Sequence, residues 1–93
     1  MVYNKIKQAI RKMMSAKHKS WKERKSNNLE YINFVKDNLN LKIDIGDSVV
    51  NILKDDDFIF THQYDSIFNS DLTKKEDIMK FVKFIDSAVK RVS

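Results

Sequence analysis

With 93 residues, the chain has the length of one small domain, and we predict a single domain over residues 1–93. The absence of cysteine excludes a disulfide framework, a thiolate metal site and a cysteine nucleophile. The longest apolar runs, such as residues 58–60, are far shorter than the roughly 20 residues of a membrane-spanning helix. We therefore expect a soluble, cytoplasmic protein with no integral membrane association. So small a domain gains little stability from its own core, which leaves room for a homo-oligomer.

Charge is distributed unevenly along the chain, whose formal net charge is +5. Residues 1–27 hold nine basic residues against Glu23 alone, a net charge of +8. Residues 28–72 hold three lysines against nine acids, or −6, and residues 73–93 hold six basic residues against three acids, or +3. The sequence therefore predicts a molecule with electrostatic poles.

Lysine outnumbers arginine fifteen to three, and the chain has ten isoleucines and eight asparagines. This bias is expected of AT-rich coding DNA and suggests a low-GC bacterium or one of its phages or plasmids. The same bias places lysine on any solvated helix face, so a lysine-rich helix can also be a solvated helix that binds no partner.

Residues 2–24 are predicted to form an amphipathic helix. Apolar side chains recur there at three- and four-residue spacing: Tyr3, Ile6, Ala9, Ile10, Met13, Met14 and Trp21. On the other side, a cationic row follows a similar spacing: Lys7, Arg11, His18, Lys22 and Lys25. Because no residue in the segment breaks a helix, the sequence predicts one continuous helix with a basic face.

Residues 26–28 read Ser-Asn-Asn, residue types whose side chains accept hydrogen bonds from the free amides that open a helix. A second helix is therefore predicted over residues 29–39. Its apolar stripe consists of Leu29, Ile32, Val35 and Leu39.

Residues 41–69 fit two structures. In the first, Asp47 caps a short helix, and a later helical stripe contains Phe60, Tyr64, Ile67 and Phe68. In the second, residues 49–53 and 58–61 are the arms of a β-hairpin joined by residues 54–57, consistent with the strand preference of β-branched and aromatic residues. We favour the helical interpretation.

A final helix is predicted to follow the capping box at residues 73–76, in which the side chains of Thr73 and Glu76 bond each other's backbone amides. Its apolar positions alternate in steps of four and three: Ile78, Val82, Ile85, Val89 and Val92. Lys90 and Arg91 lie in the last turn, where cations complement the helix dipole.

The fold class predicted from these elements is mainly α, a bundle of four or five helices. The alternative is an α+β domain with a short β-hairpin within residues 42–62. The predicted core consists of Ile6, Ile10, Met13, Ile32, Val35, Val82, Ile85 and Val89.

The basic N-terminal helix is the feature that best suggests an activity. A row of cations can displace the counterions of a nucleic acid and bind its phosphates without reading sequence. Tyr3 and Trp21 could stack on bases if the target is single-stranded. The contacts to nucleic acid, a nucleoprotein complex or another partner are predicted to be Lys7, Arg11, Lys12, Lys19, Lys22, Arg24, Lys25 and Trp21.

Other candidate sites have simpler interpretations. The run Asp55-Asp56-Asp57 lacks the alternating ligands and the glycine of a calcium loop, so we interpret it as a solvated loop. His62 and Asp65 lack a third group, and His18 has no carboxylate at a suitable spacing. We expect no metal, no cofactor and no enzymatic activity.

Two other functions remain open. The protein could inhibit another protein, as a phage anti-defence protein or a bacteriocin-immunity-like protein does, because its charge segregation suits partner choice. It could also be an assembly subunit held by the apolar faces of its first and last helices. If the acidic middle segment covers the cationic row, we expect the inhibitor; if the row faces outward, phosphate is the partner to test first.

Overall fold

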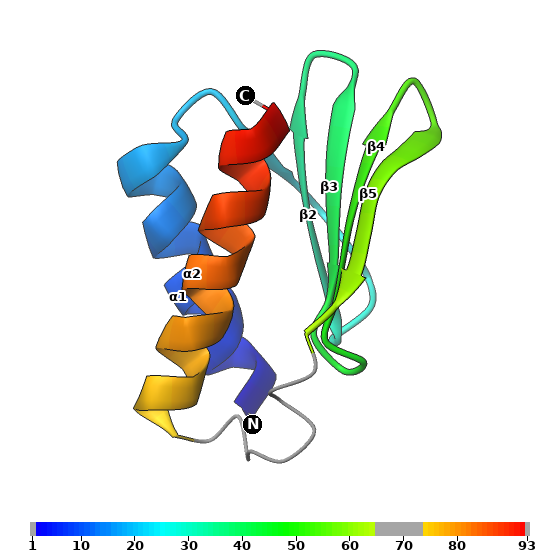
Figure 1. Ribbon diagram of the computed structural model, residues 1–93. Coiled ribbons are helices and arrows are strands. Elements are labelled where there is room, and N and C mark those ends of the chain that lie inside the picture. Colours follow the sequence, from blue (N-terminus) through cyan, green and yellow to red (C-terminus); the bar gives the residue numbers. More distant parts are fainter. Residues whose placement is uncertain (1, 65–73, 93) are drawn as a thin grey trace.

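The computed structural model describes residues 2–64 and 74–92. Over this part the chain forms a five-stranded antiparallel sheet in the order β1-β2-β3-β4-β5, with two helices on one of its faces (Figure 1). The elements are α1 (Val2–Lys17), β1 (Lys22–Arg24), β2 (Tyr31–Lys36), β3 (Leu39–Asp44), β4 (Val49–Lys54), β5 (Asp57–Gln63) and α2 (Lys75–Val92). The predicted mainly α bundle is therefore wrong. The α+β alternative names the right class and includes the hairpin β4–β5, but it underestimates the sheet.

The second predicted helix, over residues 29–39, is replaced by β2 and the turn into β3. Ile32 and Phe34, two residues apart, are both buried, whereas Val35 lies on the opposite face of the strand and Leu29 is 65% exposed. The three- and four-residue spacing of the apolar residues was thus incidental. The two-residue alternation of Ile32 and Phe34 is the one that the core uses.

Two cross-strand rows form the side of the sheet that faces the helices. One row contains Glu23, Phe34, Leu41, Ile52 and Phe60. The other contains Ile32, Ile43, Val50 and His62. The apolar members in β2, β3 and β4 are at most 3% exposed, so the core lies between this side and the helices.

The opposite side of the sheet, which we call the open face, has no described element packed on it (Figure 1). Strand alternation and register place these residues on it: Lys22, Arg24, Tyr31, Asn33, Val35, Asn40, Lys42, Asp44, Val49, Asn51, Leu53, Phe58, Thr61 and Gln63. The predicted core residue Val35 belongs to this face and is half-buried.

The hairpin β4–β5 turns at Asp55 and Asp56, whose φ angles are 51° and 67°. Positive φ at both central residues is the backbone of the two-residue turn that matches strand twist. The helical interpretation of this region, including a cap at Asp47, is wrong. Of its later stripe, Phe60 lies in β5 and Tyr64 follows that strand, while Ile67 and Phe68 lie outside the described residues.

Helix α1 ends at Lys17, so the predicted continuation over residues 18–24 is wrong. The amide of Trp21 donates to the carbonyl of His18 at 3.1 Å, and the chain turns into β1. There Lys22 pairs with Val35 in the neighbouring strand, and Trp21 is buried with 5% of its surface exposed. Pairing with β2 and burial of the indole replace the helical hydrogen bonds that the local sequence also permits.

The final predicted helix is confirmed as α2, although Thr73 of its capping box lies outside the described residues. Ile78, Ile85 and Val89 are buried, and Val82 and Val92 are partly buried against the core. The remaining predicted core residues, Ile6, Ile10, Met13 and Ile32, are also buried.

The two helices run parallel, side by side (Figure 1). On the β5 side, the ring of Phe84 in α2 lies 6.3 Å from that of Phe60 and 5.0 Å from that of His62. On the β1 side, Met14 of α1 lines a pocket together with Trp21 and Phe34. Within the described residues, no helix is long and apolar enough to cross a membrane.

Candidate functional site

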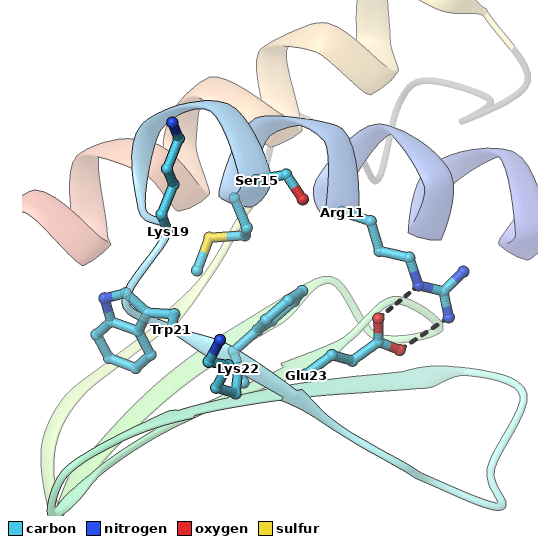
Figure 2. A pocket seen from close by; sticks show the side chains of 8 residues that line it. Arg11, Ser15, Lys19, Trp21, Lys22 and Glu23 are labelled. Carbon is cyan, nitrogen blue, oxygen red and sulfur yellow. Dashed lines mark hydrogen bonds and ion pairs between the residues drawn. The ribbon is translucent and has the colours of Figure 1, made fainter.

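One face of α1 is attached to the segment that carries β1 and leads to β2. The hydroxyl of Tyr3 donates to Glu30 Oε1 at 3.1 Å, and Lys7 Nζ donates to the carbonyl oxygen of Asn28 at 3.4 Å. One turn further, Arg11 donates to both carboxylate oxygens of Glu23, at 2.7 and 2.9 Å (Figure 2). These three residues, at every fourth position, therefore hold the helix against the sheet.

This attachment assigns a structural part to two of the sequence-predicted contact residues. Lys7 is only 9% exposed. The hydrogen bond to Glu23 raises the pKa of Arg11, and the bidentate geometry occupies its guanidinium. Neither cation is presented freely to a partner.

Trp21, which the sequence suggested as a stacking residue, is part of the core. Its indole is 5% exposed and belongs to the main apolar cluster with Met14 and Phe34. Figure 2 shows it at the opposite end of the pocket from Arg11. Its Nε1 atom is buried and has no hydrogen-bond partner. The indole contributes apolar packing rather than a surface for a base.

The other five predicted contact residues are exposed, and we call them the basic rim: Lys12, Lys19, Lys22, Arg24 and Lys25. They come from the outer side of α1, the turn after it, β1 and the residue after β1. Strand alternation places Lys22 and Arg24 on the open-face side of β1 and Glu23 on the inner side, where it meets Arg11. Because β1 is an edge strand, Lys22 also lines the pocket between α1 and β1. The one acid within the rim's sequence is thereby neutralised from the inner side.

Between α1 and β1 lies a pocket of about 380 Å³, shown in Figure 2. Its lining consists of Arg11, Met14, Ser15, Lys19, Trp21, Lys22, Glu23 and Phe34. Four of the eight contact residues predicted from the sequence line this pocket, and three of these four are cations. Its carboxylate is bonded to Arg11, and among the described residues the Ser15 hydroxyl is hydrogen-bonded to neither that carboxylate nor a lysine. Its chemistry suits anion binding.

The acidic run of residues 55–57 lies away from the basic rim. Asp55 and Asp56 form the turn between β4 and β5, and Asp57 begins β5, at the sheet edge opposite β1. Over residues 2–64 and 74–92, no ion pair joins an acid to any rim residue. The described acidic segment thus leaves the rim uncovered, the arrangement in which phosphate is the first partner to test.

The buried acid Asp86 is surrounded by His18 and two lysines. His18 Nε2 lies 2.6 Å from Asp86 Oδ1, and Lys17 and Lys90 lie 3.4 and 3.3 Å from Asp86 Oδ2. Burial raises the pKa of Asp86, but the hydrogen bonds to His18 and Lys90 and the charge of Lys17 lower it overall, below 3.8. Among the described side chains, no three His, Asp or Glu residues are placed to hold a metal ion. Asp65, the suggested companion of His62, lies outside them.

The sequence interpretation missed the open face, where five polar residues align across all five strands: Arg24, Asn33, Lys42, Asn51 and Thr61. A signal was present, because residues 39–44 read Leu-Asn-Leu-Lys-Ile-Asp, a strict alternation of apolar and polar residues. No family model, curated protein or solved structure matches this chain.

Proposed function

We propose that this protein binds nucleic acid without catalysing a reaction, and that the basic rim contacts the phosphates. The observation that carries the proposal is the exposure of Lys19, Lys22, Arg24 and Lys25 within seven consecutive residues. The acid among them, Glu23, is bonded to Arg11 on the inner side. The rim therefore presents cations to solvent without an acid between them.

Such a surface binds through counterion release. Duplex DNA carries about one negative charge per 1.7 Å, and each phosphate neutralised by a cation contributes about −0.9 to the slope of log affinity against log salt concentration. Five rim contacts predict a slope of about −4 to −5 on duplex DNA and of about −3 to −4 on a single strand. Because phosphate contacts carry no base information, the rim by itself does not select a sequence.

The test is fluorescence anisotropy with labelled duplex and single-stranded oligonucleotides at several salt concentrations. In the rim variant Lys19→Glu, Lys22→Glu and Lys25→Glu are combined. The matched control combines Lys74→Glu, Lys80→Glu and Lys83→Glu, exposed residues at or before α2 that give the same change in net charge. The rim variant should lose about tenfold or more in affinity, and the control much less.

Two outcomes would contradict the proposal. Equal losses in both variants would mean that net charge, and not the rim, governs binding. Absence of binding by the wild-type protein at low salt would remove nucleic acid as the partner. A protein retained from cell extract after nuclease treatment would then become the partner to identify.

A further inference from the structure

The open face carries a polar ladder that begins at the basic rim and crosses the sheet. Arg24 of β1 pairs with Asn33 of β2, which pairs with Lys42 of β3. Lys42 pairs with Asn51 of β4, which pairs with Thr61 of β5. Four interstrand spacings of about 4.8 Å give this ladder a span of about 19 Å. Two residues of the basic rim, Lys22 and Arg24, are thus also residues of the open face.

The centre of this surface is rich in side-chain amides. The Oδ1 atoms of Asn33 and Asn40 are buried and have no hydrogen-bond partner. Thr61 Oγ1 donates to Asn51 Oδ1 at 2.9 Å, which orients the Asn51 amide. Side-chain amides combine donors and acceptors and form hydrogen bonds with base edges.

Toward β5 the surface becomes apolar and aromatic. Phe58 is 66% exposed. The adjacent Ile59 is 47% exposed, but it is the extra residue at the irregular pairing of β4 with β5, and the register does not place it on the open face. Leu53 lies opposite Phe58 and is only 7% exposed, although it is on the side away from the helices. A solvated sheet face does not require exposed aromatic and aliphatic side chains.

Charge on this surface favours an anion at the β1 end. Lys22, Arg24 and Lys42 are its cations. Of the strand residues on the open face, Asp44 is the one acid, and it pairs with Tyr31 at the far end of β2 and β3. The charge of Asp44 and its hydrogen bond to the phenol raise the pKa of Tyr31 above 10, so this carboxylate is engaged there.

We propose that the open face binds a single-stranded nucleic acid, with phosphates on the basic rim and bases lying across the ladder toward Phe58. The inference rests on the nucleic-acid binding proposed above and adds the class of ligand. A broad sheet face reaches base edges and base planes only when the bases are unpaired. Its span suits the smallest single-strand sites, about four nucleotides long.

The experiment compares labelled single-stranded DNA, single-stranded RNA and duplex DNA of about 12 nucleotides by fluorescence anisotropy. The face variant combines Lys42→Gln with Phe58→Ala. The matched control combines Lys80→Gln with Met79→Ala, a lysine and an apolar residue exposed on α2. Thermal unfolding followed by circular dichroism verifies that both variants fold.

The wild-type protein should prefer a single strand over the duplex, and the face variant should lose about tenfold in single-strand affinity while the control does not. The DNA and RNA arms identify which strand is preferred. One result would overturn this inference and leave the proposed function intact. In that result the wild-type protein binds duplex and single strand equally, the face variant binds as well as the wild type, and the rim variant does not bind. Failure of all three probes to bind would overturn both.

Discussion

Arg11 of α1 donates hydrogen bonds to both carboxylate oxygens of Glu23 in β1, at 2.7 and 2.9 Å. The pair joins the first helix to the edge strand of the sheet. It also removes one negative charge from the middle of the basic rim, because Glu23 faces inward while Lys22 and Arg24 face outward. A contact within the fold thereby shapes the electrostatics of the outer surface.

Glu23→Gln should therefore strengthen nucleic-acid binding. Both side chains are more than a third exposed, so the loss of the ion pair should cost only about 0–1 kcal/mol of unfolding free energy. Arg11 becomes available to phosphate, and the salt dependence should steepen by about 0.7–0.9. Anisotropy titrations at several salt concentrations measure this change. Glu76→Gln on α2 alters net charge equally, and an equal gain there would refute the assignment of Arg11.

Trp21 should matter for stability more than for binding. Removing so large a buried side chain leaves a cavity, and Trp21→Ala should cost about 3–5 kcal/mol, a large part of the stability of a domain this size. Trp21→Phe loses no hydrogen bond, because Nε1 has no partner, and should cost only about 1 kcal/mol. Urea unfolding measures both. If folded Trp21→Phe binds oligonucleotides much more weakly than wild type, the indole contacts the ligand after all.

Asp86 should make stability fall in acid. Its pKa is below 3.8 in the folded state, so its contribution is fully present above pH 3.8 and is lost as pH falls through the lower folded pKa. Asp86→Asn should remove this dependence and lower stability at neutral pH by about 1–3 kcal/mol, because it loses charge-assisted hydrogen bonds to His18 and Lys90. Urea unfolding at several pH values provides the measurement. If the unfolding free energy of Asp86→Asn falls in acid as steeply as that of the wild type, Asp86 is not the cause of that fall.

Asp56→Gly should stabilise the protein. Asp56 has a φ of 67°. This backbone conformation is unfavourable for a residue with a side chain and is almost free of strain for glycine. The hydrogen bond from Asn38 Nδ2 to Asp55 Oδ2 is untouched. A gain of about 0.5–1 kcal/mol corresponds to roughly 2–8 °C in Tm for a domain of this length. Asp57→Gly removes the same charge inside β5, where no positive φ is relieved, and should destabilise.

The sequence predicted the helices better than the sheet because helices depend on local periodicity. In α2, Ile85 and Val89 are four residues apart and are both buried, as expected. Strand pairing depends on distant residues. Nothing local distinguishes Ile32–Phe34 in a strand from Ile32–Val35 in a helix; Ile32 is in a strand because it pairs with Ile43, which in turn pairs with Val50.

In the candidate site too, the sequence predicted what depends on local composition and missed what depends on distant residues. Exposed lysines such as Lys19 and Lys25 could be named from charge alone. The burial of Lys7 and Trp21 could not, because it depends on where the chain returns after α1: Asn28 meets Lys7, and Phe34 packs in the same cluster as Trp21. The row that contains Arg24 and Thr61 on the open face could not be predicted either, because it depends on the register of all five strands.

The order of the strands in the sheet is also their order along the chain, and this has a kinetic consequence. Each hairpin closes over a short connection, so strand pairing requires little loop-closure entropy and should begin quickly. During synthesis, however, the apolar side of α1 emerges before any strand, and Ile6 and Ile10 must wait for the sheet to cover them. Until then, the positive charge of the α1 lysines favours the solubility of this segment.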